Sequence, residues 1–323
     1  MTIRTLAVVG SGHHMREHLR FVENVEVVGV FDLESASRRA TSEVLGYVPV
    51  MVSAPEQLLK LEPDAVMIGS PDEFHPEHLA IFVRAGIPVL CEKPLAIDEG
   101  GLRLVRDTLS MAEAKNVRVA SCHQRRSEIG DLPYGWIRAN LAQLQKRFGE
   151  LWRIDLNSNY PAPRQEWKQH RSFLADKFVH DIDFLRALLG VGSLQAQRLF
   201  DAHNHYKVVG SMAFGERIVE ISCEGTRLHN DRDSFIECVM LNFKFGTCMV
   251  YTKTGETRLH GNETRLHETL NITPMIPDSY DRLNREVTLK FLNGEPVHTL
   301  RDLLFNTDVV VALAGEQGYY ESR

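Results

Sequence analysis

The chain has 323 residues, which is enough for two domains with separate hydrophobic cores. Its 43% hydrophobic and 25% charged residues are ordinary for a globular protein. The 43 acidic and 37 basic side chains give a net charge of -6, and no basic run stands out. Nucleic acid and anionic membranes are therefore not expected as partners.

Cysteine usage and apolar runs indicate the compartment. The five cysteines are dispersed without CxxC spacing, which favours reduced thiols over a disulfide framework or a zinc site. The start of the chain is interrupted too soon for a signal peptide, and no apolar run is long enough to span a bilayer. The sequence predicts a cytoplasmic protein.

A nucleotide-binding pattern opens the chain. The β-rich run 5–9 leads into a turn and a potential helix, and the turn reads Gly10-Ser11-Gly12-His13-His14-Met15. Gly10 permits a tight turn, and Gly12 lets backbone N–H groups approach a pyrophosphate. His13 and His14 are expected beside that pyrophosphate. Met15 replaces the third glycine of the G-x-G-x-x-G fingerprint, which predicts looser packing of helix on strand but retained phosphate binding.

The next predicted strand, 25–32, ends in Asp32. An acidic side chain at this point suits the ribose hydroxyls of NAD and repels the 2′-phosphate of NADP. Asp32 could also cap the helix that begins near Ser35. Arg38 and Arg39 lie in that helix and keep NADP as an alternative cofactor.

Strands and helices continue to alternate up to residue 122. The predicted strands are 64–70, 87–91 and 117–121, and the helices between them are 75–85 and 98–115, the second capped by Asp98. This alternation predicts a doubly wound parallel sheet. Ser70, Pro71 and His75 are expected near the cofactor, whereas His78 is expected to be exposed. No third ligand accompanies the two histidines, so no metal is expected.

Glu92, Lys93 and Pro94 follow the strand 87–91 directly. Open α/β sheets bind ligands just past the carboxyl ends of their strands. Pro94 restricts Lys93 to an extended conformation and allows a cis peptide bond. A lysine held in this way is a candidate for chemistry, although a surface Glu-Lys pair before a turn is the simpler interpretation.

These motifs, in this order, resemble the Gfo/Idh/MocA oxidoreductase family, which includes glucose-fructose oxidoreductase and inositol dehydrogenases. The resemblance implies an N-terminal Rossmann domain, 1–122, with the parallel sheet. It also implies a C-terminal α+β domain, 123–323, with a large open, mostly antiparallel sheet. Arg126 is then expected near the cofactor, together with Glu92 and Lys93. A homodimer or homotetramer through the C-terminal sheet is expected as well.

A second constellation lies at 176–183. Asp176 and His180 are four residues apart, so they share one face of a helix, and a carboxylate that orients an imidazole suits proton transfer. The resemblance implies that Lys93, Asp176 and His180 meet around a substrate carbinol. Phe178 stands where the family often has glycine, which predicts a narrowed pocket. A capped helix with a structural His-Asp pair is the alternative.

The rest of the chain is rich in β-runs, at 194–200, 205–214, 218–223, 235–243 and 248–252. Trp167, Lys168 and Arg171 are candidates for the lining of a substrate pocket. A Thr-Arg-Leu-His echo, at 257–260 and 264–267, is interpreted as a polar loop. Helices are predicted at 278–292 and 300–316.

The sequence thus predicts an NAD-dependent or NADP-dependent oxidoreductase. It would transfer a hydride between the nicotinamide and a carbinol or ketone of a sugar, amino sugar or cyclic polyol. His180 is the expected proton-transfer group, oriented by Asp176, and Lys93 stabilises the alkoxide; His180 and Lys93 could exchange roles. The alternatives are a reductase of an imine, enal or tetrapyrrole, suggested by Phe178, and a non-catalytic sensor of NAD(P).

Overall fold

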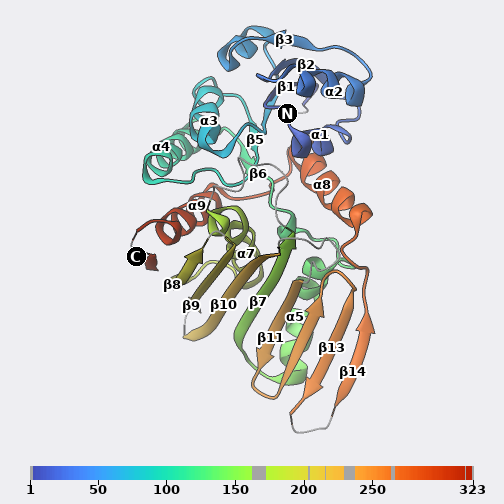
Figure 1. The fold of residues 1–323 in the computed structure, drawn as a ribbon, viewed down its shortest axis with the longest axis vertical. Coiled ribbons are helices and arrows are strands. Elements are labelled where there is room, and N and C mark those ends of the chain that lie inside the picture. The colour runs from blue at the N-terminus through green and yellow to red at the C-terminus, as the bar shows by residue number, and fades with distance from the viewer. Residues whose placement is uncertain are drawn as a thin grey trace. The chain divides into compact units, whose positions relative to one another are not determined.

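The computed structural model describes residues 3–161, 172–202, 204–214, 216–228, 237–262, 266–316 and 318–321. The chain forms two compact units, whose elements are labelled in Figure 1. The first comprises Met1–Gln124 and Asp281–Val311, and the second comprises Arg125–Tyr280 and Ala312–Arg323. The expected division into 1–122 and 123–323 therefore misses one feature, the return of residues 281–311 to the first unit.

The first unit contains a six-stranded parallel sheet in the order β3-β2-β1-β4-β5-β6. Its strands are β1 (Thr5–Val9), β2 (Glu26–Phe31), β3 (Val50–Val52), β4 (Ala65–Ile68), β5 (Val89–Cys91) and β6 (Val119–Ser121). The expected doubly wound sheet is confirmed. Only β3 was not predicted; it is a three-residue edge strand with little buried apolar surface.

Helices cover both faces of this sheet. They are α1 (His13–Leu19), α2 (Ser35–Leu45), α3 (His75–Arg84), α4 (Glu99–Lys115), α8 (Pro277–Leu292) and α9 (Leu300–Ala314), with 3-10 turns η1 (Pro55–Leu61), η2 (Asp72–Phe74) and η3 (Gln124–Arg126). Asp98 accepts a hydrogen bond from the backbone N–H of Gly101 at 2.8 Å, which confirms the predicted cap.

The two faces explain why residues 281–311 join the first unit. Phe291 of α8 packs in the core of one face, together with Met15 and Leu19 of α1. Leu303 and Val311 of α9 pack in the core of the other face, with side chains of α3 and α4. Helices α8 and α9 therefore bury apolar surface that α1, α3 and α4 leave uncovered. Burial of apolar surface drives folding.

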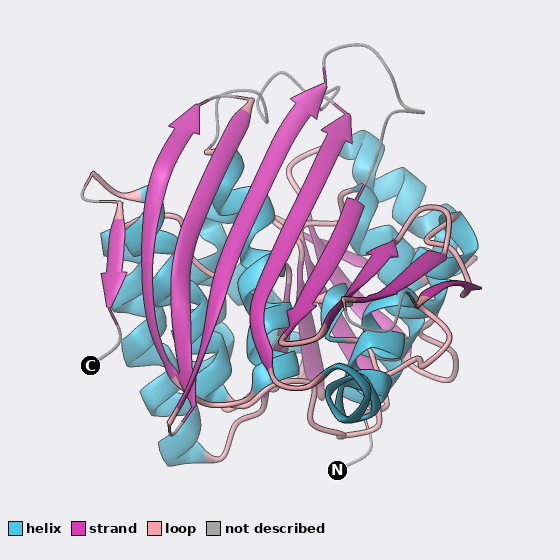
Figure 2. Ribbon diagram, turned by 90° about the horizontal axis from the view of Figure 1, so that it is seen from below, coloured by secondary structure: helices cyan, strands magenta, loops and turns pink. Residues whose placement is uncertain are grey.

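The second unit contains a nine-stranded sheet in the order β14-β13-β12-β11-β7-β10-β9-β8-β15, seen in Figure 2. Its strands are β7 (Leu151–Pro161), β8 (Ser193–Ala202), β9 (His205–Phe214), β10 (Arg217–Leu228), β11 (Glu237–Phe243), β12 (Gly246–Tyr251), β13 (Glu256–Gly261), β14 (His267–Asn271) and β15 (Tyr319–Glu321). Strands β7 and β10 pair in parallel, and the other neighbours pair antiparallel. The expected large, mostly antiparallel sheet is confirmed.

One face of this sheet is covered by α5 (Pro133–Phe148) and α7 (Phe173–Leu189). Along β11, buried side chains alternate with partly exposed ones. Phe243 faces Phe148 of α5, with ring centroids 6.0 Å apart, and Tyr206 of β9 faces Phe178 of α7 at 6.3 Å. This alternation is typical of a sheet with one buried face, and the other face remains open within the unit.

The expectation of a polar loop at the Thr-Arg-Leu-His echo is wrong for its first copy, 257–260, whereas Thr264 and Arg265 of the second copy lie outside the described residues. Residues 256–261 and 267–271 form the hairpin β13-β14, in which His260 pairs with His267. Thr257 and Leu259 are buried, so an inward-outward alternation is present although most of the side chains are polar. Trp167, Lys168 and Arg171 lie outside the described residues.

In the part of the chain that the structure describes, the helices are all too short or too polar to cross a bilayer.

Candidate functional site

The glycine turn after β1 is built as the nucleotide-binding interpretation requires. Gly10 has φ +75, and its N–H donates to the carbonyl of Phe31 at 2.7 Å. A Cβ at Gly10 would lie 2.4 Å from the backbone nitrogen of Ser70. Only glycine fits this position, because the ends of β1, β2 and β4 converge on it.

Asp32 holds this turn from the end of β2. Its Oδ2 accepts hydrogen bonds from the N–H and the hydroxyl of Ser11, at 2.7 and 3.0 Å. Its Oδ1 accepts from the N–H of Glu34 at 2.8 Å. Glu34, not Asp32, is the N-cap of α2, so Asp32 supports the start of this helix from two residues before it. A carboxylate is thereby fixed beside the turn.

Met15 does not loosen the packing of α1. Its side chain is 1% exposed, and a Cβ at Gly69 would lie 2.9 Å from both Cβ and Cε of Met15. Gly69, directly after β4, therefore supplies the space that the fingerprint's third glycine would otherwise supply. The expectation of looser packing is wrong, because a residue distant in sequence compensates for the substitution.

His75 connects two loops at the carboxyl ends of β4 and β5. Its Nε2 lies 2.7 Å from the carbonyl of Ser70, and its Nδ1 lies 2.7 Å from the carbonyl of Pro94. The ring is 1% exposed. Both nitrogens thus face backbone oxygens, which indicates that His75 positions the loops and does not present a donor to a ligand.

His78 is buried, contrary to expectation. Its Nδ1 lies 2.8 Å from the hydroxyl of Ser70, and its ring stacks on Phe74 with centroids 6.0 Å apart. Burial, aided by the neighbouring His75, lowers the pKa of His78 to about 4. An uncharged ring therefore holds the Ser70 hydroxyl at neutral pH.

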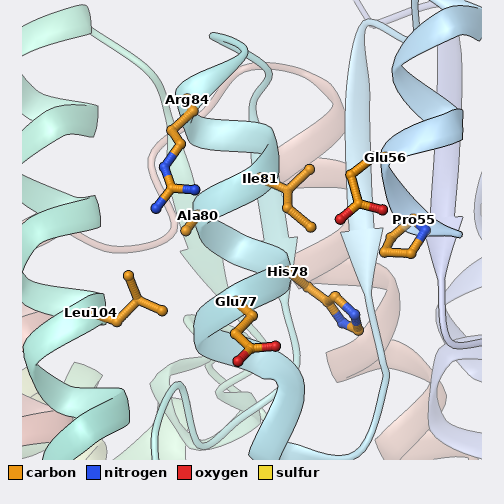
Figure 3. A pocket seen from close by; sticks show the side chains of 8 residues that line it. All are labelled: Pro55, Glu56, Glu77, His78, Ala80, Ile81, Arg84 and Leu104. Atoms are coloured by element: carbon orange, nitrogen blue, oxygen red, sulfur yellow. The ribbon is translucent and has the colours of Figure 1, made fainter.

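A cavity of about 300 Å³ lies beside this histidine, between η1, α3 and α4 (Figure 3). The sequence did not indicate it. Its lining consists of Pro55, Glu56, Glu77, His78, Ala80, Ile81, Arg84 and Leu104. None of the predicted catalytic or cofactor-binding residues is among these.

Glu92 and Lys93 follow β5, and the Lys93-Pro94 peptide bond is cis, as the sequence allowed. The backbone N–H of Glu92 donates to the carbonyl of Ile68 at 2.8 Å. Burial raises the pKa of the Glu92 carboxyl, but His18, His14 and Lys93 outweigh it and hold this pKa at about 2. Three basic groups therefore surround an ionised carboxylate at this strand end.

Helix α7 carries Asp176 and His180 in the second unit. It begins with Ser172, whose hydroxyl accepts from the N–H of Ala175, and both candidate residues are half-buried. Asp176 also forms an ion pair with Lys177, at 3.2 Å. Because Asp176 and His180 are four residues apart, the helix places them on one face.

Phe178 is fully buried and packs on Tyr206. It lies two residues from both Asp176 and His180, which is about 200° around the helix axis, so it points to the opposite side. The expectation that Phe178 narrows a substrate pocket is wrong. Phe178 is part of the core between α7 and the sheet.

Two arginines hold α7 in place. Arg126 pairs with Asp183 through Nε and a terminal nitrogen, at 3.1 and 3.0 Å, and Asp183 is fully buried. Arg125, which the sequence did not single out, forms buried ion pairs with Asp181 and Glu237. The structure therefore gives Arg126 an anchoring role on α7, and its expected contact with the cofactor stays a prediction.

The buried carboxylates of Asp181 and Glu237 share the guanidinium of Arg125. Asp181 also accepts from the hydroxyl of Tyr206 at 2.8 Å, and Glu237 accepts from the hydroxyl of Thr252 at 2.9 Å. Burial is the main cause that raises the pKa of Asp181 to about 6, and the charge of Glu237 adds to it. The sequence contained a signal for these ion pairs, because the adjacent arginines at 125–126 are complementary in charge to the Asp-x-Asp pair at 181–183.

Comparison with known proteins is consistent with this geometry. Residues 4–123 match the GFO_IDH_MocA model, described as an oxidoreductase family with an NAD-binding Rossmann fold. An inositol 2-dehydrogenase from Agrobacterium fabrum is 28% identical over 217 residues. That match covers 64% of this chain and 61% of the relative, which is less than two thirds of the relative's length.

Two solved structures share the whole fold. Myo-inositol 2-dehydrogenase from Lactobacillus plantarum has a TM-score of 0.78 at 17% identity, with 100% of both chains covered. Biliverdin reductase from Synechocystis sp. PCC 6803, solved with biliverdin and NADP+, has a TM-score of 0.73 at 17% identity, with 96% of this chain and 98% of that chain covered. Residues 4–123 of this chain are therefore similar to the GFO_IDH_MocA oxidoreductase family, which has an NAD-binding Rossmann fold.

Proposed function

We propose that this protein is a nicotinamide-dependent dehydrogenase that interconverts a carbinol and a ketone on a cyclic polyol or sugar. The observation that carries the proposal is the Asp32 carboxylate, which Ser11 fixes beside the glycine turn. A carboxylate at this place is suited to the ribose hydroxyls of a dinucleotide. The match to an inositol 2-dehydrogenase supports a polyol as substrate.

NAD is the proposed cofactor. The charge of Asp32 repels a 2′-phosphate, which favours NAD over NADP. Arg38 donates to the backbone carbonyl of Asp32 at 2.6 Å, so a guanidinium is close enough to keep NADP as a weaker alternative. The residues proposed to surround the cofactor are Gly10, Ser11, Gly12, His13, His14, Met15, Asp32, Ser70, Pro71, His75, Glu92, Lys93 and Arg126. Among these, His75 would act by positioning the loops of Ser70 and Pro94.

The proposed chemistry places Lys93, Asp176 and His180 around the reacting carbon. Bound NAD would accept the hydride from that carbon. His180 takes the proton of the substrate hydroxyl, and Asp176 orients its ring and stabilises the imidazolium. Lys93 stabilises the negative charge that develops on the oxygen, or else exchanges this role with His180.

The test is the absorbance of reduced nicotinamide when purified protein is mixed with NAD or NADP and a panel of inositols, aldoses and amino sugars. We expect turnover with a cyclic polyol and NAD, and slower turnover with NADP. If the absorbance changes in neither reaction direction, although calorimetry confirms cofactor binding, the dehydrogenase is contradicted and a sensor of NAD(P) is favoured. Phe178 no longer supports the alternative of a reductase of an imine, enal or tetrapyrrole, because it lies in the core.

We further propose that the open face of the nine-stranded sheet joins copies of the chain into a dimer or tetramer. Met240 and Met249 pair across β11 and β12 on this face, and Ile218 of β10 is 63% exposed. Adaptable apolar side chains of this kind are common at interfaces. Light scattering on the eluting protein should give a multiple of the chain mass of 36.7 kDa; a monomer would contradict this part.

A further inference from the structure

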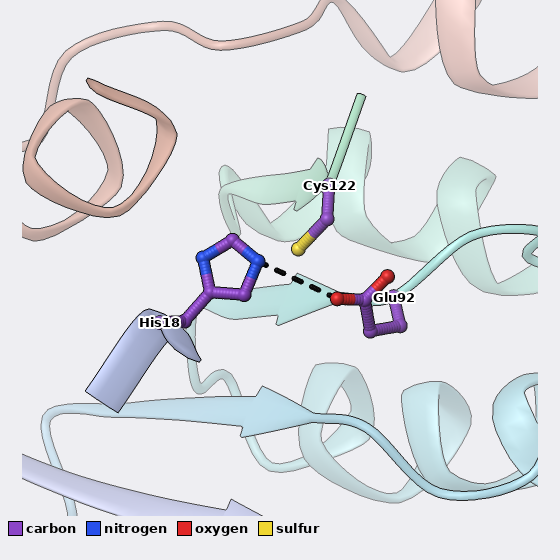
Figure 4. Close-up of side chains that lie close together, drawn as sticks. All are labelled: His18, Glu92 and Cys122. Atoms are coloured by element: carbon purple, nitrogen blue, oxygen red, sulfur yellow. Dashed lines mark ion pairs between the residues drawn. The ribbon is translucent and has the colours of Figure 1, made fainter. Parts of the chain in front are cut away.

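His18, Glu92 and Cys122 lie together at the carboxyl ends of two neighbouring strands of the first unit (Figure 4). They come from α1, from the residue after β5 and from the residue after β6. One imidazole nitrogen, one carboxylate oxygen and the thiol sulfur all lie within 4.8 Å of one another. His18 is 1% and Cys122 is 2% exposed, whereas the Glu92 side chain is 15% exposed, so two of the three groups are shielded from solvent.

The spacing of the ion pair between His18 and Glu92 also suits a shared cation. Nε2 of His18 lies 3.4 Å from Oε1 of Glu92. An N–H···O hydrogen bond usually measures about 2.7–3.2 Å. Two ligand atoms that each lie about 2.0–2.1 Å from a tetrahedral zinc ion stand about 3.3 Å apart. The nitrogen and the oxygen therefore have the separation of two corners of a zinc tetrahedron, and the sulfur lies within 4.8 Å of both.

A buried hydroxyl orients the histidine. Nδ1 of His18 lies 2.8 Å from the hydroxyl of Thr288, which is fully buried on α8. When Nδ1–H donates to Thr288, the lone pair of Nε2 points into the cluster. Histidines that bind metals usually have such a partner on the other nitrogen, because it fixes the tautomer and the ring plane.

We propose that Nε2 of His18, a carboxylate oxygen of Glu92 and the sulfur of Cys122 bind one Zn²⁺ ion or a chemically similar divalent cation. Nitrogen, oxygen and sulfur together are the ligand set of borderline-soft cations, and three protein ligands leave a fourth position for water. As the metal–sulfur bond forms, the S–H bond of Cys122 breaks and its proton leaves to solvent; no electron is transferred.

The site goes beyond the proposed dehydrogenase, and its test does not depend on turnover. Full-length protein, treated with a chelator and freed of NAD, is titrated with Co²⁺. We expect one bound Co²⁺ per chain, a thiolate-to-cobalt charge-transfer band in the near ultraviolet and the strong visible bands of tetrahedral cobalt. Zn²⁺ added at an equal amount should remove these bands.

Matched variants identify the ligands. Cys122→Ser should abolish the charge-transfer band, whereas Cys91→Ser should keep it, since Cys91 is equally buried on the adjacent strand but packs in the other core. Thr288→Val should weaken Co²⁺ binding about 10- to 100-fold through the loss of the histidine's partner. His18→Gln should weaken it further.

Two results would overturn the site. One is the absence of any charge-transfer band in the wild-type protein at saturating Co²⁺. The other is a band that Cys122→Ser leaves intact. Should Cys122→Ser fail to fold, Thr288→Val and His18→Gln decide the question: unchanged Co²⁺ affinity in both would reject the site, and weakened affinity in both would support it.

Discussion

Ser11 donates to one oxygen of Asp32 twice, from its backbone N–H at 2.7 Å and from its hydroxyl at 3.0 Å. The first glycine turn and the end of the second strand are therefore a single hydrogen-bonded structure. In the proposed function this carboxylate therefore has two roles, because it holds the turn and would also select the cofactor through its ribose.

Replacement of Asp32 should change cofactor preference. Hydrogen bonds to a charged group contribute about 1.5–3 kcal/mol, so Asp32→Asn should weaken NAD binding about 10- to 100-fold. NADP binding should hold or improve, because the repulsion of its 2′-phosphate is removed. Calorimetric titration measures the affinity for both cofactors. Glu34→Gln is the control, because it removes a negative charge only two residues from Asp32. An equal loss for both cofactors would contradict the selective role.

His180→Ala should lower turnover without changing cofactor affinity. Loss of a general acid or base costs about 100- to 10,000-fold in rate. The matched control is His205→Gln in the same unit, where the ring pairs with Glu224 at 2.8 Å and has no proposed role in the reaction. Turnover of His180→Ala within a few-fold of wild type would remove His180 from the chemistry.

Alanine substitutions at Gly69 and Gly12 should distinguish an effect on packing from an effect on cofactor binding. A Cβ at Gly69 would meet Met15 at 2.9 Å, whereas a Cβ at Gly12 would meet no atom within 4 Å. Overpacking costs about 1–3 kcal/mol, so Gly69→Ala should lower the free energy of unfolding by that amount. Gly12→Ala should leave stability nearly unchanged but weaken NAD binding, since the Cβ occupies the approach of the pyrophosphate.

Thermal melting without cofactor, together with NAD titration, tests both variants. Equal melting temperatures for Gly69→Ala and wild type would show that Met15 has room to move and that Gly69 does not compensate for the missing glycine. Unchanged NAD affinity in Gly12→Ala would place the pyrophosphate elsewhere.

Local signals in the sequence were sufficient for the Rossmann sheet and the glycine turn. Gly10, Asp32 and Lys93-Pro94 each stand at or directly after the end of a predicted strand, and that local pattern was enough to single them out, although the contacts that hold Gly10 and Asp32 come from Ser70 and Ser11. Phe178 could also have been placed correctly, because about 100° of rotation per residue puts it opposite Asp176 and His180.

Other features depend on contacts between distant segments. The space for Met15 comes from Gly69, and the pairing of Arg125 with Glu237 crosses 112 residues. The return of α8 and α9 to the first unit, and the meeting of His18 with Cys122, have no local pattern at all. Such pairings follow from the tertiary fold, which competes with and overrides local preference.

Asp181 should make the stability of the second unit depend on pH. Its pKa rises from 3.8 to about 6 on folding, so the native unit favours the protonated form. The stabilisation is complete below pH 4 and is lost as the pH rises through about 6. The shift corresponds to about 3 kcal/mol.

Asp181→Asn isolates the contribution of the Asp181 carboxyl to the pH dependence, because asparagine has nearly the same shape and does not titrate. All three tryptophans, Trp136, Trp152 and Trp167, lie between residues 125 and 280, so their fluorescence during urea unfolding reports on the second unit. Between pH 4.5 and 7.5, the free energy of unfolding of wild type minus that of Asp181→Asn should fall by about 1–3 kcal/mol. A difference that is constant, or that grows with pH, would mean that Arg125 keeps Asp181 ionised throughout this pH range.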